Sequence, residues 1–198
     1  METHERMVTQ PGTTQRTARD GRPWVLRPAR PTDARGLAAL FAAVRAEGRW
    51  LLTPPSALSQ PSEAFFIGEM IRGHDGLALV AEAEAEVIGN VLVSVERSTV
   101  SSHVGTLSIV VAADWREVGI GSEMVRAAQA WCADSGLLKL GLAVFPDNAR
   151  AIAVYERTGF VREGLRRAQY RGEGGVLRDE LLMAWFPPGS PAATEGGA

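Results

Sequence analysis

The sequence predicts one domain of mixed α/β (α+β) architecture, in which helices pack against a sheet. Two observations lead to this prediction. Apolar runs typical of strands alternate with amphipathic helical stretches in the order β-α-α-β-β-β-α-β-α-β-β. The 198 residues are 45% hydrophobic and 22% charged, an ordinary composition for a globular domain with a substantial buried core.

The overall charge and the cysteine count exclude several classes of protein. The formal net charge is −2, so bulk electrostatics gives no reason to expect nucleic acid or an anionic membrane as a partner. Cys132 is the single cysteine, which rules out an intramolecular disulfide and a multi-cysteine metal site, and we expect no metal. No apolar run approaches the roughly 20 residues that span a bilayer, and the N-terminus lacks the apolar stretch of a signal peptide. We therefore expect a cytoplasmic protein.

The ordered domain is expected to cover residues 23–186. Residues 1–22 are polar and show no periodicity, so we expect an unstructured N-terminal tail. Residues 187–198 are rich in proline, glycine and small side chains, and we expect an unstructured C-terminal tail there for the same reason.

The first part of the domain predicts a strand followed by two helices. The strand is expected at residues 24–28. Thr32 and Asp33 offer caps for the first helix, whose apolar side chains recur at helical spacing. These side chains are Leu37, Leu40, Phe41 and Val44. The second helix is expected over about residues 62–72, after a proline-containing loop.

Three strands and a helix are predicted next. Residues 77–81 and 87–95 flank an acidic turn, which indicates a hairpin, and residues 106–111 form a further strand. The helix follows Gly121 and ends at Gly136. Its apolar face carries Met124, Ala128, Trp131 and Cys132.

The last part of the domain predicts a strand, a helix and a closing pair of strands. Residues 138–144 form the strand. Asn148 opens the helix and Gly159 stops it. The closing strands are expected at about residues 160–170 and 176–185.

A glycine motif, Arg116-x-x-Gly119-x-Gly121, lies where the strand ending at Val111 gives way to the next helix. Glycines at a strand-to-helix turn let the backbone approach a ligand closely, and the first helical turn presents unpaired N–H groups to that ligand. Such a turn can bind phosphate, although glycines needed only for packing would give the same pattern.

Two familiar nucleotide-binding motifs do not fit this turn. A P-loop needs Gly-Lys-Ser/Thr, and here Ser122 and Glu123 follow the second glycine. A Rossmann fingerprint needs a third glycine, and Met124 occupies that position.

A second pattern lies on the helix that Asn148 opens. Asn148 and Tyr155 are seven residues apart, so they lie on nearly one face and roughly 10 Å apart along the axis. That face can line a groove with an amide at one end and a phenol at the other. Taken alone, Asn148 would be interpreted as a helix cap and Tyr155 as a core residue.

Together these patterns resemble the GNAT superfamily of acyl-CoA-dependent N-acetyltransferases. The resemblance covers most of residues 77–186. It rests on Arg116-x-x-Gly119-x-Gly121, Asn148-x-x-Ala151-x-x-x-Tyr155-x-x-x-Gly159-Phe160, Glu163-Gly164-x-x-Arg167 and Asp179-Glu180-x-x-Met183. The chain departs from the commonest family pattern at Glu117, which is often glycine, and at Ala113, which is often proline.

The resemblance implies the GNAT fold, a central, mostly antiparallel mixed sheet flanked by four helices. A V-shaped split is expected between the fourth and fifth strands, which end at Val111 and Val144. Acetyl-CoA would lie in this split as the cosubstrate. The backbone of Ile109, Val110 and Val111 would bind the pantetheine arm as though it were an added strand.

The resemblance also implies the other cofactor contacts. Backbone N–H groups of the glycine motif would hold the pyrophosphate. The residues concerned are Arg116, Glu117, Val118, Gly119, Ile120, Gly121 and Ser122. Asn148 would bond to the pantetheine arm, Ala151 is small enough to admit the cofactor, and Tyr155 completes the set.

The reaction implied is attack of an amine on the thioester carbonyl. It needs a base for the amine, a donor for the oxyanion and an acid for the departing thiolate. Tyr155 stands at the family position of the acid, and a phenol with a reference pKa of about 10 stays protonated at neutral pH. A backbone N–H near Val111 would stabilise the oxyanion. The base stays open, with Glu96 as the tentative choice and His103 or Ser108, the latter as a water ligand, as the others.

The acceptor is expected to be a primary amine of a small molecule, such as an amino acid, or of a protein N-terminus. Arg49 and Trp50 lie in the loop that roofs the acceptor pocket in the family. Arg167 either belongs to a solvated edge or binds an acidic group of the acceptor. Analogy with similar proteins allows a homodimer. The alternative function is a catalytically silent module that binds acetyl-CoA, because the strand 106–111 carries no carboxylate.

Overall fold

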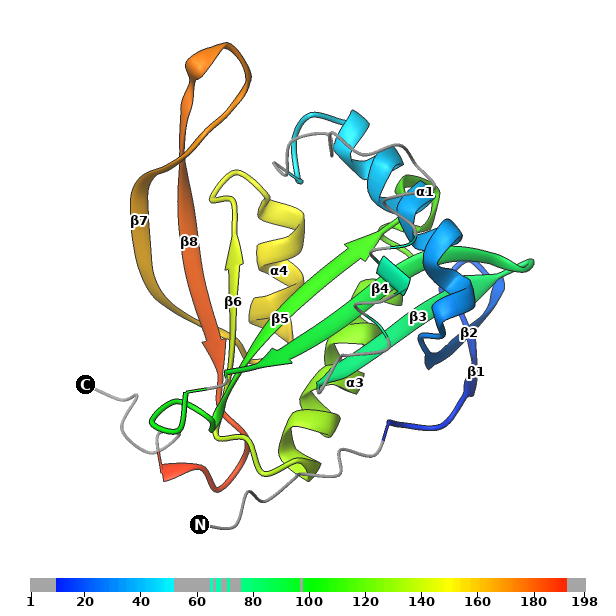
Figure 1. Ribbon diagram of the computed structural model, residues 1–198, viewed down its shortest axis with the longest axis horizontal. Helices are drawn as coiled ribbons and strands as arrows, with labels where there is room; N and C mark the ends of the chain where they lie inside the picture. Colours follow the sequence, from blue (N-terminus) through cyan, green and yellow to red (C-terminus); the bar gives the residue numbers. More distant parts are fainter. Residues whose placement is uncertain are drawn as a thin grey trace.

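The computed structural model describes residues 10–51, 65, 67, 68, 71, 76–96 and 98–191. Its centre is an eight-stranded sheet in the order β1-β2-β3-β4-β5-β6-β8-β7 (Figure 1). The strands are β1 (Thr14–Thr17), β2 (Pro23–Pro28), β3 (Leu77–Ala83), β4 (Glu86–Val95), β5 (Val104–Val111), β6 (Lys139–Val144), β7 (Val161–Arg171) and β8 (Leu177–Trp185). The helices are α1 (Ala34–Ala46), α3 (Ile120–Asp134) and α4 (Ala149–Arg157), with short 3-10 turns at Pro31–Asp33, Ala113–Trp115 and Glu173–Gly175.

The sheet splits between β5 and β6. These two strands form the one parallel pair of the described sheet, and they pair only where Val104–Thr106 meet Lys139–Gly141. Beyond Thr106 the two strands diverge, while β5 stays paired with β4 along its whole length and β6 stays paired with β8 (Figure 1). The predicted V-shaped split and the fold class are therefore confirmed, with the split one strand later in the order because β1 precedes the expected first strand.

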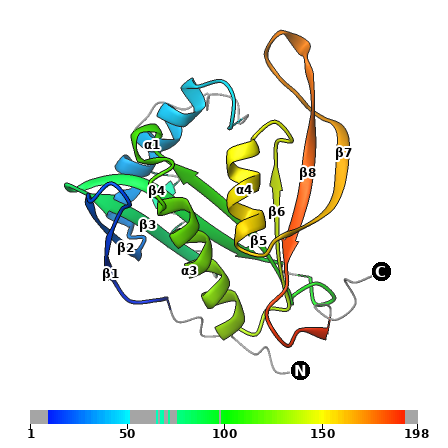
Figure 2. The same cartoon turned by 180° about the vertical axis from the view of Figure 1, so that it is seen from behind.

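Helices cover both faces of the sheet. α1 lies on one face, and α3 and α4 lie on the other, as the two opposite views show (Figures 1 and 2). β3 explains how one strand serves both layers, because Leu79 and Ala81 belong to the large core under α3 whereas Val80 packs with Leu37 of α1. A strand buried on both faces is continuously apolar, which is how residues 77–81 read in the sequence. Among the described helices, none is long and apolar enough to cross a membrane.

The N-terminal boundary predicted at residue 22 is wrong. β1 pairs antiparallel with β2, from Thr14 opposite Leu26 to Thr17 opposite Pro23, and the following Ala18 is 5% exposed. β1 escaped the sequence reasoning because it is a polar edge strand held through its backbone, which leaves no apolar periodicity. Residues 1–9 lie outside the described part of the chain.

The C-terminal boundary of the domain lies later than the predicted residue 186. Ser190 is buried, and its hydroxyl donates a hydrogen bond of 3.1 Å to the carbonyl of Leu138, so the chain stays attached to the domain beyond residue 186.

The structure describes three α-helices where four were expected. The predicted helix at residues 62–72 falls largely outside the described residues, and Phe65, Ile67, Gly68 and Ile71 are helical.

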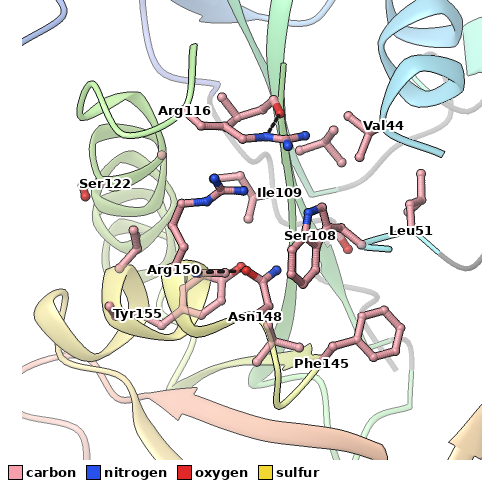
Figure 3. Close-up of a pocket in the computed structure, with 18 of the residues that line it drawn as sticks. Val44, Leu51, Ser108, Ile109, Arg116, Ser122, Phe145, Asn148, Arg150 and Tyr155 are labelled. Atoms are coloured by element: carbon pink, nitrogen blue, oxygen red, sulfur yellow. Dashed lines mark hydrogen bonds between the residues drawn. The ribbon is translucent and has the colours of Figure 1, made fainter. Parts of the chain in front are cut away.

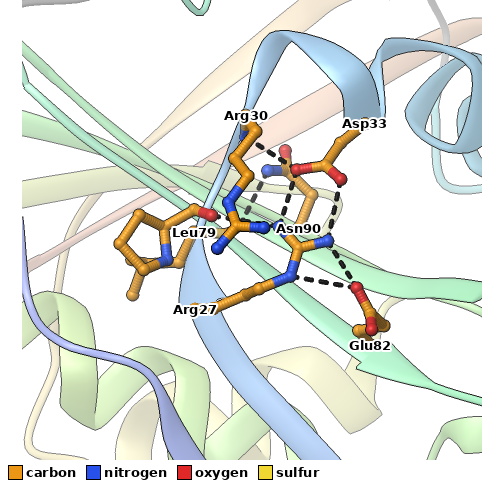
Figure 4. A network of polar contacts seen from close by, with 7 residues as sticks. Arg27, Arg30, Asp33, Leu79, Glu82 and Asn90 are labelled. Carbon is orange, nitrogen blue, oxygen red and sulfur yellow. Dashed lines mark hydrogen bonds and ion pairs between the residues drawn. The ribbon is translucent and has the colours of Figure 1, made fainter. Parts of the chain in front are cut away.

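A buried ionic network joins the start of α1 to the sheet (Figure 4). The guanidinium of Arg27 in β2 donates two hydrogen bonds of 2.8 Å to Asp33 and also binds Glu82 of β3. The hydrogen bonds with Asp33 raise the pKa of Arg27 above its usual value. Burial opposes ionisation of Asp33, but its hydrogen bonds from Arg27 and Arg30 outweigh that effect and lower its pKa.

Candidate active site

A cavity of about 1010 Å³ opens where β5 and β6 part (Figure 3). Its walls come from β5 and β6, the start of α3, α4, β7 and β8, and from the end of α1 with the residues that follow it. The lining residues that concern the chemistry are Ser108, Ile109, Val110, Val111, Arg116, Glu117, Gly119, Gly121, Ser122, Phe145, Asn148, Ala151, Tyr155, Tyr170 and Glu180.

The glycine motif forms the turn that starts α3. Gly119 is the N-cap and adopts φ +98°, a left-handed conformation that favours glycine. A Cβ placed on Gly121 would meet no atom within 4 Å, so its Cα faces open space, and the residue lines the cavity. Ser122 of the first turn of α3 also lines the cavity, and the N–H groups of a first helical turn have no partner within their helix.

Two residues of the predicted pyrophosphate set do not line the cavity. Val118 uses its carbonyl to accept a hydrogen bond of 2.9 Å from the backbone N–H of Arg19. Ile120 is 1% exposed and points into the core under the sheet. The other five, Arg116, Glu117, Gly119, Gly121 and Ser122, line it.

Arg116 fixes this turn in place. Its Nε donates a hydrogen bond of 2.9 Å to the carbonyl of Val111, and its two terminal nitrogens bind the carboxylate of Glu47 at 2.8 and 2.6 Å. The hydrogen bonds from Arg116 lower the pKa of Glu47. The side chain of Arg116 therefore joins the end of β5 to the end of α1, and its charge is already neutralised.

The edge of β5 beside the cavity is free of strand partners. Val111 pairs with Gly89 of β4 on one side, but β6 has already diverged on the other. Ile109, Val110 and Val111 line the cavity along this edge. An unpaired strand edge offers N–H and C=O groups to any extended ligand that can add as a further strand.

α4 supplies an amide and a phenol to the opposite wall. The side-chain oxygen of Asn148 accepts a hydrogen bond of 3.2 Å from the N–H of Ala151, so Asn148 caps the helix as well as lining the cavity. Tyr155 is 7% exposed, and its ring packs against Phe160 with centroids 5.7 Å apart. Burial raises the pKa of Tyr155 above its usual value, so the phenol keeps its proton at neutral pH and can donate it.

The far end of the cavity holds a buried carboxylate that the sequence reasoning missed. Glu180 in β8 is 4% exposed and lines the cavity. It accepts a hydrogen bond of 2.5 Å from the hydroxyl of Tyr170 and one of 3.0 Å from Arg166. The bond with Glu180 raises the pKa of Tyr170. The pattern Asp179-Glu180 was noted in the sequence, but only the sheet register shows that Glu180 faces the cavity.

A shift of register in β7 brings Tyr170 and Arg166 to the same carboxylate. Arg166 lies opposite Glu180, whereas Tyr170, four residues later, lies opposite Arg178, only two residues away on β8. Ala168 sits in this bulge with φ +51°. Such a bulge changes where side chains point and was not readable from the sequence.

The tentative base Glu96 lies away from the cavity. Its backbone N–H donates to the carbonyl of Val104, at the beginning of β5, and its side chain is exposed. His103 lies at the same end, where its carbonyl accepts from Leu138. Since Ser108 is the first residue of β5 at the cavity, about 13 Å further along the strand, neither residue reaches it. The assignments of Glu96 and His103 as candidate bases are therefore wrong. The antiparallel pairing of β4 and β5 places the end of β4 beside the start of β5, away from the cavity.

Of the three predicted acceptor residues, one lines the cavity and two do not. Trp50 lines the cavity together with Val44 and Leu51. Arg49 lies behind it, with its guanidinium 4.6 Å from the centre of the Trp50 ring. Arg167 is exposed on β7 and is not among the lining residues.

Three arginines of the cavity were not anticipated. Arg19 comes from the segment that the sequence predicted to be a tail, and Arg150 and Arg157 come from α4. In Figure 3 the side chain of Arg150 extends from α4 across the cavity towards Ile109.

Within the described ranges, no cluster of three metal-ligating side chains occurs. Cys132 is buried, which raises its pKa to about 12, so it is no thiolate nucleophile at neutral pH.

Comparison with known proteins identifies the family of this fold and site. A sequence profile of the acetyltransferase (GNAT) family matches residues 45–160, more than half of the chain. The chain belongs to the GNAT acetyltransferase family. The resemblance stated from the sequence motifs is thereby confirmed.

Individual members of the GNAT family agree with this assignment. An L-amino acid N-acetyltransferase of Escherichia coli strain K12 is 34% identical over 108 residues, which are 54% of this chain and 65% of that protein, so the match spans less than two thirds of the relative. A GNAT acetyltransferase structure from Streptococcus pneumoniae superposes with a TM-score of 0.73 at 26% identity, over 82% of this chain and 99% of the other. A phosphinothricin acetyltransferase from Sinorhizobium meliloti, solved in complex with acetyl-CoA, gives a TM-score of 0.69 at 24% identity, over 86% and 93% of the two chains, and shares the fold.

Proposed function

We propose that this protein transfers the acetyl group of acetyl-CoA to the primary amine of a small molecule, of the amino acid class. One observation carries the proposal. A single cavity joins an unpaired strand edge, the free N–H groups of a helix start and a buried, protonated phenol. These are the groups that an extended thioester with a pyrophosphate requires.

The residues present fit acetyl-CoA as the cosubstrate. The backbone of Ile109, Val110 and Val111 is available to the amide-containing pantetheine arm, and Gly121 leaves open space beside the N–H groups that would hold the pyrophosphate. Ala151 has a small side chain on the α4 wall, and a larger side chain at this position would fill part of the cavity.

Tyr155 supplies the proton that the leaving group needs. When the amine nitrogen bonds to the acetyl carbon, the carbon–sulfur bond breaks and its electron pair leaves with the sulfur. Tyr155 lines the same cavity, and its hydroxyl donates its proton to that sulfur, which releases CoA as a neutral thiol. Its raised pKa keeps it in the acidic, proton-bearing form.

Glu180 takes the role of base that the sequence analysis gave to Glu96. It is a carboxylate in a cavity that Trp50, Leu51 and Phe145 also line. Tyr170 and Arg166 fix its orientation through hydrogen bonds. A carboxylate in this place attracts an acceptor ammonium and accepts the proton that the amine loses, directly or through a water molecule.

The size and polarity of the acceptor end support a small amine with an apolar side chain. Phe145 packs edge to face on Tyr170 at 5.8 Å, and Trp50 and Leu51 add apolar surface from the roof. The similarity to an L-amino acid N-acetyltransferase supports an amino acid as the acceptor class. A protein N-terminal amine presents the same nitrogen chemistry and is the second acceptor to be tested.

The test is a panel of acceptors with acetyl-CoA as the donor and release of the CoA thiol as the readout. The panel contains the L-amino acids, their amides, short peptides, polyamines and aminoglycosides. We expect turnover with one or more amino acids of apolar side chain and little with polyamines. Tight binding of acetyl-CoA without turnover on any amine would instead support a silent acetyl-CoA-binding module.

A further inference from the structure

The N-terminal segment at residues 14–22 lies against the glycine motif (Figure 2). The backbone N–H of Arg19 donates a hydrogen bond of 2.9 Å to the carbonyl of Val118, which ties the segment to the turn before α3. The side chain of Arg19 covers Gly119, since a Cβ placed there would lie 3.4 Å from Nε and 3.5 Å from Cγ of the arginine. Arg19 therefore belongs to the same wall as the predicted pyrophosphate site.

The neighbouring arginines already have carboxylate partners. Arg16 binds Glu123, Arg22 binds Asp20 at 2.7 Å, and Arg116 binds Glu47. Arg126 shares Glu123 at 2.9 Å, and Arg150 lies 3.6 Å from Glu117. Arg19 differs from these five, as does Arg157 on α4, because its guanidinium pairs with no carboxylate among the residues that the structure describes.

Arg19 also lies between two hollows of the surface. It lines the main cavity, and it lines an adjoining cavity of about 260 Å³ that Gln15, Thr17 and Ser122 share. A cation at this place meets any anionic group that extends from the N-terminus of α3 towards β1. Arginine binds phosphate oxygens through two parallel N–H groups, and such bonds are stronger than those between neutral groups.

We propose that Arg19, supplied by the N-terminal segment, binds a phosphate of the CoA nucleotide. The inference rests on the proposed acetyl-CoA function and adds a cofactor contact from residues outside the matched family region, which begins at residue 45. The phosphate is either the pyrophosphate or the 3′-phosphate of the ribose, and both offer the same oxygen chemistry to the guanidinium. The segment that the sequence marked as a tail is then part of the cofactor site.

The test measures the dissociation constants of CoA and of 3′-dephospho-CoA by isothermal titration calorimetry. The variant is Arg19→Gln, and the matched control is Arg35→Gln, which removes one positive charge from an exposed position on α1. We expect Arg19→Gln to bind CoA about tenfold more weakly and Arg35→Gln to bind like the wild type. Circular dichroism of both variants checks that the fold is kept.

The two ligands distinguish the two phosphates. If Arg19 binds the 3′-phosphate, the wild type loses about tenfold on dephospho-CoA and Arg19→Gln no longer discriminates between the ligands. If Arg19 binds the pyrophosphate, the variant loses the same factor on both. Wild-type affinity of Arg19→Gln for both ligands overturns the inference, whereas a wild type that binds neither ligand overturns the proposed function itself.

Discussion

Tyr155 is the residue on which the proposed chemistry depends most. It lies on α4 among apolar neighbours, with its ring against Phe160, and burial keeps its phenol protonated. Its position two helical turns after Asn148 was readable from the sequence, because a single helix preserves the spacing of its residues. The burial of Tyr155 was not readable from the sequence, because it depends on how α4 packs against the sheet.

Replacing Tyr155 by phenylalanine tests its role as the acid. We expect kcat to fall by about 10²-fold or more, because the leaving sulfur then lacks a proton donor, while the dissociation constant of CoA changes little. Because the pKa of Tyr155 is raised, its ionisation should cause no loss of wild-type activity below about pH 10. Steady-state kinetics from pH 6 to about pH 10 measure both effects. Equal kcat of variant and wild type throughout would remove Tyr155 as the acid.

Glu180 is the second residue with a direct test. We expect Glu180→Gln to lower kcat/KM for the amine by about 10²-fold at neutral pH, with partial recovery at high pH, where more of the free acceptor amine is unprotonated. The neighbouring Asp179→Asn is the matched control, since Asp179 does not line the cavity and binds the N–H of Ala168 instead. Equal losses in the two variants would contradict a role of Glu180 in binding or deprotonating the amine.

The residues that sequence reasoning missed share a physical reason. Glu180 lies on β8, whose neighbour β6 is about 40 residues away in the sequence, and Arg19 reaches the site because its backbone N–H binds the carbonyl of the distant Val118. Glu96 was misplaced although the hairpin around Glu84 and Ala85 was predicted correctly, because its end of β4 meets the start of β5. Local motifs predicted local geometry, and the acceptor end is built from non-local contacts.

At the scale of elements, the turn before α3 determines the geometry of the proposed phosphate site. Glu117 and Gly119 both adopt positive φ, +66° and +98°. Glycine accepts this conformation freely, whereas glutamate is strained there by about 1 kcal/mol. The departure from the family pattern noted at Glu117 therefore has a structural cost.

The pair Glu117→Gly and Gly119→Ala tests this geometry. We expect Glu117→Gly to raise the free energy of unfolding by about 0.5 kcal/mol, since relief of strain exceeds the added chain entropy and the lost ion pair with Arg150 is exposed and weak. Gly119→Ala should lower it by about 1–2 kcal/mol, because the new methyl group forces an unfavourable φ beside Arg19. Urea unfolding measures both, and a stabilising Gly119→Ala would contradict the turn as described.

The order of elements after residue 76 was predictable, because each carries its own periodicity and its own stop. α3 ends before Gly136, which has φ +67°, and α4 begins at the cap Asn148. β1 was not predictable, since its polar residues carry no pattern and its place depends on backbone pairing with β2 and on the ion pair of Arg16 with Glu123.

For the whole molecule, the position of α1 decides whether the acceptor end has a roof. α1 has its own small core with β3, and the Arg27, Asp33 and Glu82 network attaches its first turn to β2 and β3. At its other end, Glu47 binds Arg116 beside the phosphate turn. The first turn of α1 is thus fixed to β2 and β3, and its C-terminal end is fixed to Arg116, which lines the cavity.

Arg27→Met should destabilise the fold by about 3 kcal/mol at neutral pH, because it leaves the buried Asp33 without its partner. The pKa of Asp33 is lowered in the folded state, so its contribution is present above the unfolded value of about 4 and is lost as the pH falls through the folded value. We therefore expect the wild type to lose stability below about pH 4 and Asp33→Asn to show a shallower slope. Parallel slopes in urea unfolding from pH 7 to pH 2 would contradict this assignment.

In the mechanism that we propose, acetyl-CoA and an amine react in the cavity between β5 and β6. The most direct measurement is mass spectrometry of the products formed from an equimolar mixture of L-amino acids and acetyl-CoA, with the wild type and Tyr155→Phe at equal concentration. We expect an N-acetylated amino acid, formed with one equivalent of CoA thiol and at a rate about 10²-fold lower for the variant. No acetylated product from the wild type, under conditions where calorimetry shows acetyl-CoA bound, would contradict it.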